Sequence, residues 1–540
     1  MTENAVIILG AGLMQEPAIR AAKELGFKTV VADGNPSAVC AKLADIFEAV
    51  DLKDKEGLVG LAEKVKASGL NLAGVFTAGT DFSANTAWVA QTFNLPGHSY
   101  EACLNASNKV RMRECFQKNG IPSPAFEEVD ENRLAEILNL AEKGKIIFPK
   151  VIKPVDNMGG RGCRLVRSAE ELKPAVSSAI KNSRTKKAVF EDYMDGAEFS
   201  IDALIYNGTF TVTGFADRHI YYPPYFIETG HTMPSSVNEE IKKQLIAAFA
   251  LGAKSLGLTQ GVAKADIKYT KNGPMIGEIA ARLSGGYMSG WTFPYSSGCF
   301  LTKEALKIAA GMEPDYITKN RRKIQWVPYK TEENIQPPYE LFELPSLKVS
   351  AERAWVSIPG KIAQVLGLEE AKKVSGVQEV FPRKKNGDEA DFPRNNVEKC
   401  GNVITAAPDR KSAEKAAVEA LNKITLILEP GNKKTEDFLS GNEQPDEKGF
   451  PPPAFCVEVD WSKVKNIPAK AKTADFIPEE IKKVQAEISD WNLCTFEQAV
   501  KKFDSIFPGH EALDGRKFWK AALRGSIQGM LYVAEKGEQK

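Results

Sequence analysis

Runs of apolar residues divide the first hundred residues into strands and helices. Three runs are short enough to be buried strands: residues 5–9, 29–33 and 74–77. Residues 17–26 have helical spacing between the first two strands, which gives a β-α-β unit. The pattern predicts a doubly wound α/β domain over residues 1–107. Its substrate crevice should lie at the carboxyl ends of the strands, near Gly12, Gln15 and Asp81.

Residues 148–167 combine two short strands with a glycine loop. The first strand, at residues 151–152, brings Lys153 inward, and the second begins at residue 165. The loop between them contains Gly159, Gly160 and Gly162. Such a backbone can approach a ligand closely and turn several N–H groups toward one anion. The segment therefore predicts a hairpin that binds phosphate, with Lys153 as a point charge. An ordinary glycine turn beside a solvated lysine would show the same pattern.

A second hairpin is predicted within residues 260–282. The Asn-Gly pair at residues 272–273 is typical of its turn. Asp266 and Glu278 lie on the two arms, so both can point to one face. Two facing carboxylates repel each other unless a cation lies between them, and oxygen ligands suit Mg²⁺ carried by a nucleotide phosphate. Two solvent-facing acids, each paired with a lysine, are the alternative.

The second half of the chain contains fewer candidate site residues. Residues 323–428 show short strands and two helices, and residues 431–453 are polar and rich in proline and glycine, which predicts a linker. Residues 454–540 are predicted to be a helical domain. Its expected core residues are aromatic: Trp491, Phe496, Phe503, Phe507, Trp519 and Tyr532.

Composition and charge narrow the classes of function. A chain of 540 residues has room for two to four domains, and its formal net charge of +1 argues against nucleic-acid or membrane binding through bulk charge. Eight cysteines without a Cys-x-x-Cys pair favour a reducing cytoplasm. No apolar run approaches the length of a membrane span. We expect a soluble, unprocessed cytoplasmic protein.

Gln15 replaces the third glycine of the dinucleotide fingerprint, so a nicotinamide cofactor is not favoured.

The order and spacing of five features resemble the ATP-grasp superfamily. They are Lys109, Lys153, the glycine loop, the segment 191–198 and the hairpin that ends at Arg282. The resemblance covers about residues 1–430 and is nearest to carbamoyl-phosphate-synthetase-like and L-amino-acid-ligase enzymes. It implies an ATP-grasp fold with a pre-ATP-grasp domain before it and a helical domain after it. The implied parts are a pre-ATP-grasp domain at 1–107, an ATP-grasp domain at 108–430, a linker at 431–453 and the helical domain at 454–540. Within the second part, the lid subdomain is expected at about 120–190 and a C-terminal subdomain at about 315–430.

The resemblance also implies a role for each site residue. The expected phosphate ligands are Lys109, Lys153, Gly159, Gly160, Arg161 and Gly162. Glu191, Asp192 and Met194 would read adenine, largely through backbone groups, and Glu198 would hold the ribose. The expected metal ligands are Asp266 and Glu278. Arg282, Lys153 and His231 would be catalytic, with His231 in a substrate loop formed by residues 228–234.

Two positions depart from the family pattern. Ala280 stands where a metal-binding asparagine is usual, and Gly160 stands where many members have serine. Mg²⁺ keeps water ligands readily, so one cation can still bind, but a second is in doubt.

The implied activity is an ADP-forming ligase. It would activate a small carboxylic acid, most plausibly an amino acid, as an acyl phosphate and join it to an amine, with ATP and Mg²⁺ as cofactors and Mn²⁺ as a substitute. A homodimer is compatible with this function. The alternative is a non-catalytic ATP-binding regulatory or scaffold protein. A biotin-carboxylase-like use of bicarbonate is less favoured, because the chain has no biotin carrier motif.

Overall fold

A computed structural model describes residues 3–329, 335–442 and 449–538 as two compact units. The first unit consists of Met1–Met158, Leu165–His219 and His231–Ser350. The second consists of Gly159–Arg164, Ile220–Gly230 and Ala351–Lys540. The chain thus passes between the units several times, and one crossing lies within β11 (Ile227–Met233).

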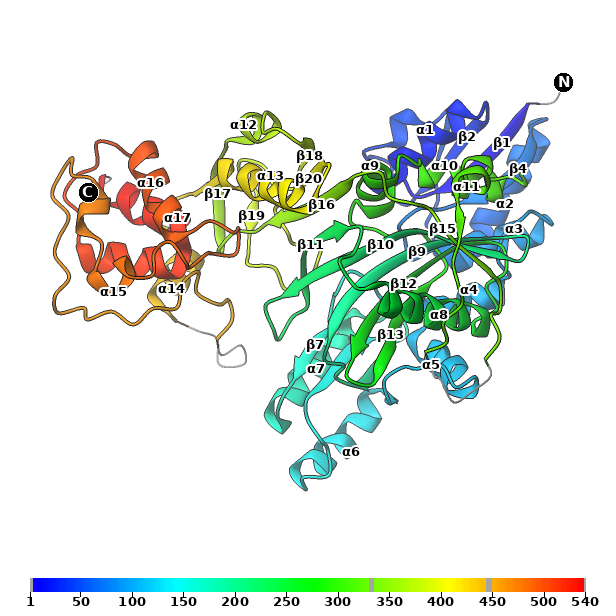
Figure 1. The fold of residues 1–540 in the computed structure, drawn as a ribbon, viewed down its shortest axis with the longest axis horizontal. Coiled ribbons are helices and arrows are strands. Elements are labelled where there is room, and N and C mark those ends of the chain that lie inside the picture. Colours follow the sequence, from blue (N-terminus) through cyan, green and yellow to red (C-terminus); the bar gives the residue numbers. More distant parts are fainter. Residues whose placement is uncertain (1–2, 330–334, 443–448, 539–540) are drawn as a thin grey trace. The chain divides into compact units, whose positions relative to one another are not determined.

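The first unit opens with a parallel four-stranded sheet in the order β3-β2-β1-β4 (Figure 1). Its strands are β1 (Asn4–Leu9), β2 (Lys28–Asp33), β3 (Ile46–Ala49) and β4 (Asn71–Phe76). The associated helices are α1 (Glu16–Glu24), α2 (Lys55–Ala67) and α3 (Ser83–Thr92). Apolar side chains from both faces of β1 are buried, because helices cover each face. The predicted α/β fold of this region is confirmed.

An antiparallel sheet in the order β5-β8-β6-β7 contains the predicted glycine hairpin. Its strands are β5 (Phe126–Val129), β6 (Lys150–Pro154), β7 (Arg164–Val166) and β8 (Ala188–Asp192). Helices α6 (Glu131–Glu142) and α7 (Ala169–Asn182) pack on it around Ile152, Val166 and Leu172.

A larger sheet of the first unit has the strand order β13-β12-β9-β10, with β15 beside β10 and β14 beside β15. Its strands are β9 (Ala197–Tyr206), β10 (Thr209–Tyr221), β12 (Gly261–Thr270), β13 (Gly273–Ala280), β14 (Arg322–Lys323) and β15 (Glu340–Glu343). The Asn-Gly pair forms the predicted turn between β12 and β13. Helix α8 (Glu239–Ser255) packs along these two strands in Figure 1 and buries Leu245 and Phe249.

Short helices connect these sheets. They are α4 (Tyr100–Ser107), α5 (Lys109–Lys118), α9 (Phe293–Ser297), α10 (Leu301–Ala309) and α11 (Asp315–Asn320), with a π-helical turn at Met288–Thr292. Asn108 caps α5 by accepting from the Val110 and Arg111 amides, which fixes Lys109 at the first position of that helix.

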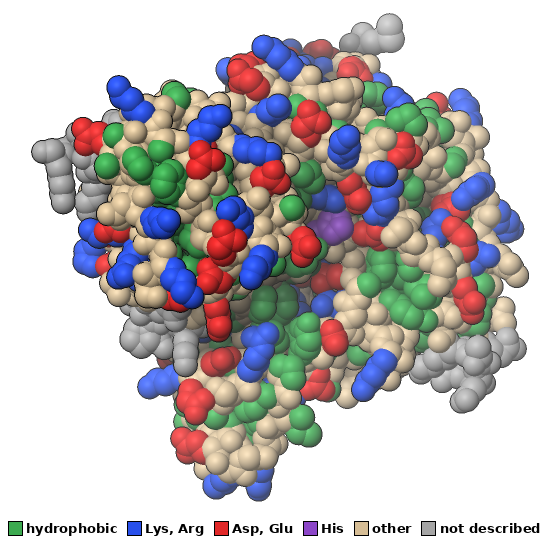
Figure 2. Space-filling view, turned by 60° about the vertical axis from the view of Figure 1, so that its left-hand side comes forward, with side chains coloured by type: hydrophobic (Ala, Val, Ile, Leu, Met, Phe, Trp, Pro, Cys, Tyr) green, Lys and Arg blue, Asp and Glu red, His purple; other side chains and the backbone are tan. Residues whose placement is uncertain are grey.

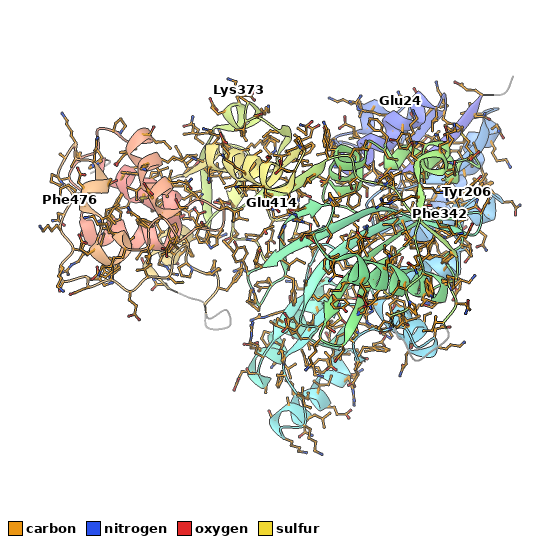
Figure 3. All side chains as sticks on the ribbon, viewed as in Figure 1. Glu24, Tyr206, Phe342, Lys373, Glu414 and Phe476 are labelled. Atoms are coloured by element: carbon orange, nitrogen blue, oxygen red, sulfur yellow. The ribbon has the colours of Figure 1, made fainter. Side chains whose placement is uncertain are left out.

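The second unit combines strands and helices around a single hydrophobic core. Its strands are β16 (Val349–Trp355), β17 (Gly360–Leu366), β18 (Val377–Pro382), β19 (Glu389–Ala390), β20 (Gly401–Ala407) and β21 (Thr425–Leu428). They pair in the orders β16-β20-β18 and β19-β17-β21. Its helices are α12 (Leu368–Lys372), α13 (Arg410–Lys423), α14 (Lys433–Ser440), α15 (Glu479–Lys482), α16 (Phe496–Ile506) and α17 (Gly515–Glu538). Glu414 of α13, labelled in Figure 3, pairs with Arg353 of β16 at 3.2 Å.

The expectation of a linker at residues 431–453 is wrong for its first part. Asn432 caps α14, and Phe438 and Leu439 of that helix are buried in the core of the second unit. Residues 443–448 lie outside the described residues. Five of the six predicted core aromatics of the C-terminal region are buried in the same cluster as Trp355, and Phe507 packs against it half-buried, so strands and helices of this unit share one core.

Charges of both signs are interspersed on the face drawn in Figure 2, in line with the net charge of +1. Within the described residues, no helix is both long and apolar enough to cross a membrane.

Candidate active site

Lys153 belongs to a buried ion-pair network. Its Nζ lies 2.6 Å from Glu191 Oε2, and Arg113 Nε donates to Glu191 Oε1 at 2.8 Å. Arg113 is fully buried, and its Nη2 also donates to the Gly277 carbonyl at 2.6 Å. Burial acts to raise the pKa of Glu191, but the charges of Arg113 and Lys153 outweigh it and hold the pKa below its ordinary value. As a carboxylate anion, Glu191 therefore holds Lys153 in position.

The segment predicted to read adenine is held by several contacts of its own. Asp192 contacts Lys150, and its amide donates to the Ala125 carbonyl at 3.0 Å. The Met194 carbonyl accepts from Lys268 Nζ at 3.1 Å. The Glu191 side chain points to Lys153 and Arg113, which leaves backbone groups of this segment for the predicted contact with adenine.

Lys109 and Glu278 face each other at the start of α5 and on β13. Lys109 Nζ lies 3.6 Å from Glu278 Oε2 and donates to the Asn157 carbonyl at 2.8 Å. Burial acts to raise the pKa of Glu278, yet Lys109, Lys264, Arg282 and Lys153 together lower it to about 2. Lys109 and Lys153, which are predicted to bind phosphate, and the predicted catalytic Arg282 thus act electrostatically on Glu278, a predicted metal ligand.

Asp266 and Glu278 are Cα partners across β12 and β13, so their side chains share one face of the hairpin, as predicted. Asp266 is paired with Lys264, and with Arg218 Nη1 at 2.7 Å. The same Arg218 nitrogen lies 2.7 Å from Glu198 Oε1, and Lys268 Nζ lies 3.5 Å from Glu198 Oε2. Both the predicted metal acid and the predicted ribose acid therefore carry cationic partners.

These donors fit one Mg²⁺ with few protein ligands. Within the described residues, no three His, Cys, Asp or Glu side chains gather in a geometry that could hold a metal ion. Asp266 and Glu278 supply carboxylate oxygens, but Ala280 supplies none, and its Cα partner on β12 is Lys264. The remaining ligands would have to be phosphate oxygens and water, which Mg²⁺ accepts.

Arg282 follows β13 and is 8% exposed. Its Nη1 donates to the Leu283 carbonyl at 3.0 Å, and within the described residues it forms no ion pair. The loop after it is fixed by Asp202, which is fully buried. Asp202 accepts from Ser289 Oγ at 2.7 Å and from the Ser284 hydroxyl and amide. Burial raises the pKa of this carboxyl group. Asp202 was not predicted from the sequence.

The predicted glycine loop belongs to the second unit. Gly159, Gly160 and Gly162 have φ values of 70°, 76° and 68°, which favour glycine. The Gly159 carbonyl accepts from the Asn396 amide at 2.8 Å, and the Asn396 side chain accepts from the Glu228 amide at 2.8 Å. Lys399 donates to the Glu228 carbonyl at 2.8 Å. The phosphate role of this loop, including Arg161, stays a prediction.

His231 does not lie in a loop, which corrects the expectation for residues 228–234. The segment forms strand β11, and His231 is fully buried in the first unit. The hydroxyl oxygen of its neighbour Thr232 lies 3.1 Å from His219 Nε2. The catalytic role of His231 stays a prediction.

A pocket of about 360 Å³ in the first unit contains several of the predicted residues. Lys109, Glu278, Ala280 and Arg282 line it, together with Asp81 and Arg184. Gln15, expected at the crevice, lies elsewhere: it is buried and accepts from the Ala78 amide at 2.9 Å. It thereby fixes the loop that carries Asp81.

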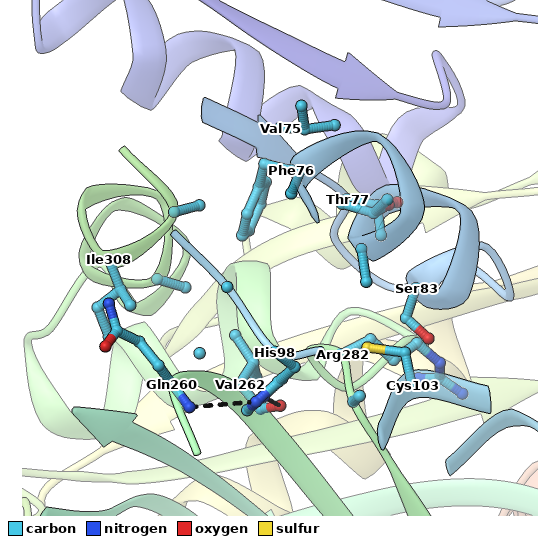
Figure 4. A pocket seen from close by; sticks show the side chains of 18 of the residues that line it. Val75, Phe76, Thr77, Ser83, His98, Cys103, Gln260, Val262, Arg282 and Ile308 are labelled. Atoms are coloured by element: carbon cyan, nitrogen blue, oxygen red, sulfur yellow. Dashed lines mark hydrogen bonds between the residues drawn. The ribbon is translucent and has the colours of Figure 1, made fainter. Parts of the chain in front are cut away.

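A smaller cavity of about 70 Å³ shares Ser83 and Arg282 with this pocket (Figure 4). Its walls are mostly apolar and include Phe76 and Val262. His98 in this cavity bonds to the Val262 carbonyl at 2.9 Å, and the Gln260 amide donates to its Nδ1 at 3.2 Å. Burial lowers the pKa of His98 to about 4, so the ring is neutral at physiological pH.

The sequence did not indicate four charged residues that contact the predicted site residues or the loop after Arg282. They are Arg113, Asp202, Arg218 and Lys264. Asp202 and Lys264 could have been noticed as charged residues within apolar strand patterns. Arg113 could have been noticed as a charged residue on the inner face of an amphipathic helix.

Two family models match the chain. The ATP-grasp domain matches residues 146–290, and the L-amino acid ligase C-terminal domain 2 matches residues 354–429. A protein of Sinorhizobium fredii named y4rH is 23% identical over 425 residues, which are 76% of this chain and 80% of that protein.

Human carnosine synthase 1 is 25% identical over 350 residues, which are 59% of this chain and 41% of that protein. The chain therefore matches only about two fifths of that synthase. The crystal structure of L-amino acid ligase from Bacillus licheniformis superposes with a TM-score of 0.63 at 22% identity, covering 79% of this chain and all of that one. This superposition supports the fold of the chain.

Proposed function

The chain belongs to the ATP-grasp superfamily, and on that premise we propose that it is an ADP-forming carboxylate–amine ligase. It would activate a small carboxylic acid, in our proposal an amino acid, as an acyl phosphate and join it to an amine. The observation that carries the proposal is the pocket that Lys109, Arg282 and Glu278 line together, in which Lys109 Nζ lies 3.6 Å from Glu278 Oε2. Such a cluster suits a polyphosphate and its transferred phosphoryl group.

Activation is needed because a carboxylate is anionic and lacks a leaving group. Lys109 and Lys153 would draw negative charge from the phosphates of ATP, and Arg282 would stabilise the phosphoryl group during its transfer to the carboxylate. The amine would then displace phosphate from the acyl carbon, and ADP and phosphate would be released. Glu191 keeps Lys153 in place during these steps, because the two are joined by a 2.6 Å ion pair.

Asp266 and Glu278 would hold Mg²⁺. When bound, the cation would neutralise negative charge on the phosphates, and we expect Mn²⁺ to substitute for it. Lys264 stands opposite Ala280 and contacts Asp266, so it adds positive charge where the usual asparagine would add a ligand. A single divalent cation is therefore our expectation.

Ala280→Asn should lower the Mg²⁺ concentration for half-maximal turnover several-fold, because it restores one ligand oxygen. The measurement is acid-dependent ADP release over a Mg²⁺ series, with manganese binding by electron paramagnetic resonance as a second readout. Ala49→Asn, an exposed position on β3, is the matched control. Full Mg²⁺-dependent activity in Glu278→Ala would remove this site from the proposal.

The reaction itself is tested with ATP, Mg²⁺ and a panel of carboxylic acids and amines. We expect ADP and phosphate release that requires an acid, and hydroxamate when hydroxylamine replaces the amine. AMP and pyrophosphate as products would rule out the proposed chemistry.

A non-catalytic ATP-binding regulatory protein remains the second candidate. It is favoured by Ala280 and by the existing pairs of Asp266 with Lys264 and Arg218, which compete with a metal ion. Tight ATP binding without acid-dependent ADP release across the panel would support it. The cytoplasmic location and the homodimer stay predictions.

A further inference from the structure

The glycine loop between β6 and β7 is costly to hold in one conformation. Gly159, Gly160 and Gly162 lose more conformational entropy on ordering than other residues would. If the loop became ordered only when ATP arrived, this cost would be subtracted from the affinity for ATP. One bond within the loop joins the Cys163 amide to the Gly160 carbonyl at 3.1 Å. Further contacts come from residues 394–399 of the second unit, to which the loop belongs.

Residues 394–399 form an anchor loop that is fixed by bonds of its own. Glu398 Oε2 accepts from the Arg394 amide at 2.7 Å, and Glu398 Oε1 accepts from Asn395 Nδ2 at 2.6 Å. Directly before this loop, Phe392 is fully buried in the core of the second unit. The anchor loop is therefore a firm support for a flexible neighbour.

Asn396 of the anchor loop contacts the glycine loop through its backbone. Its amide donates to the Gly159 carbonyl at 2.8 Å. A Cβ atom on Gly159 would lie 3.5 Å from Val397 Cγ2, and one on Gly160 would lie 3.7 Å from Asn396 Nδ2. These are ordinary van der Waals distances, so the two loops pack against each other. Arg383 Nη1 donates to the Asn396 carbonyl at 3.2 Å and fixes this residue from the other side.

The side chain of Asn396 binds a third segment. Its Oδ1 accepts from the Glu228 amide at 2.8 Å. Lys399, whose side chain is 1% exposed, donates to the Glu228 carbonyl at 2.8 Å. The anchor loop thus holds both backbone groups of Glu228, which lies three residues before the predicted catalytic His231. Asn396 is the residue that contacts both this segment and the glycine loop.

We propose that Asn396 is a positioning residue that holds the glycine loop ready for the phosphates of ATP and joins it to the segment around Glu228. The inference rests on the proposed function, because it takes the glycine loop to bind phosphate. Asn396 would touch no substrate. It would act because the entropy of ordering the loop is lost during folding and not when ATP binds. ATP affinity should therefore depend on a side chain of the second unit.

The test removes the side-chain bond and keeps the backbone. In the full-length enzyme, Asn396→Ala should raise the KM for ATP about 3- to 10-fold, the loss expected for one hydrogen bond. The kcat at saturating ATP should change little. Amide hydrogen exchange of residues 159–163, measured without nucleotide, should become faster. Asn396→Asp keeps an acceptor oxygen and should restore most of the ATP affinity and of the protection from exchange.

Asn386→Ala is the matched control. Asn386 Oδ1 accepts from the Val365 amide at 3.0 Å, so this variant loses the same kind of bond elsewhere in the second unit and should alter neither quantity. A merely structural role of Asn396 would reduce the fraction of active enzyme, which lowers kcat and leaves the KM for ATP unchanged. That result would overturn the proposal, as would a folded Asn396→Ala enzyme with wild-type ATP affinity.

Calorimetric binding of a non-hydrolysable ATP analogue separates this proposal from the ligase proposal. If no acid supports ADP release, but Asn396→Ala weakens analogue binding 3- to 10-fold, the positioning role stands while the ligase proposal falls. If the wild type binds no analogue, both fall. If Asn396→Ala does not fold, the wild type decides: the amides of Glu228 and Asn396 must be protected from exchange before nucleotide is added. Exchange at the rate of an unstructured peptide would overturn the proposal.

Discussion

Glu191→Ala is expected to lower the free energy of unfolding of the first unit by about 3–5 kcal/mol, the cost of breaking a buried ion pair. Glu191 is 1% exposed, and it is the carboxylate between Arg113, which is fully buried, and Lys153. Its removal leaves a buried guanidinium that keeps only its bond to the Gly277 carbonyl. Lys153 also loses the anion that holds it, so we expect weaker ATP binding.

The measurement is urea unfolding followed by tryptophan fluorescence, supported by calorimetric Tm values. Glu128→Ala is a suitable control, because Glu128 lies on neighbouring β5 and pairs with Lys187 at 2.5 Å, but both side chains are more than a third exposed. An exposed pair of this kind contributes about 0–1 kcal/mol. Equal losses in the two variants would show that the buried network is not what stabilises this sheet. Glu191→Gln, which keeps the shape, should lie between them.

Arg282→Ala is expected to lower kcat for acid-dependent ADP release by about 10²–10³-fold, the usual loss when one stabilising group of a transition state is removed. The charge of Arg282 helps to lower the pKa of Glu278, and within the described residues its guanidinium forms no ion pair at contact distance. Arg282→Lys should recover little, because an ammonium group cannot contact two oxygens with a planar fork.

This effect should appear in kcat while ATP affinity, measured by calorimetry, changes much less. Arg322→Ala is the matched control, since that arginine is 63% exposed and pairs with Glu343 at 2.7 Å. Unchanged kcat in a folded Arg282→Ala enzyme would remove this residue from the catalytic machinery.

The hairpin with Asp266 and Glu278 could be predicted because all of its information is local. The Asn-Gly turn sets the register, and the period of two along each strand then places both carboxylates on one face. The network around Glu191 could not be predicted in the same way. Arg113 is 78 residues away, and nothing near either residue indicates the other.

Two predictions were incorrect for different reasons. Residues 228–234 were expected to form a substrate loop because of the family resemblance, yet tertiary pairing makes Ile227–Met233 strand β11. Residues 433–440 were assigned to a linker from composition, although Asn432 is a good helix cap and Phe438 and Leu439 can be buried on one side. In this second segment, average polarity concealed a few positions with strong local preferences.

The order in which the chain leaves the ribosome has a consequence for the second unit. Its first pieces are the glycine loop and residues 220–230, and the Glu228 amide bonds to Asn396, which is 168 residues further along. At a synthesis rate of about 5–20 residues per second, these pieces wait roughly 10–50 seconds for that partner. During this interval the nascent first unit can fold, while the Gly159 carbonyl lacks its hydrogen bond from the Asn396 amide. We expect the loop to be the part most sensitive to proteases and chaperones in ribosome-bound chains that end before residue 396.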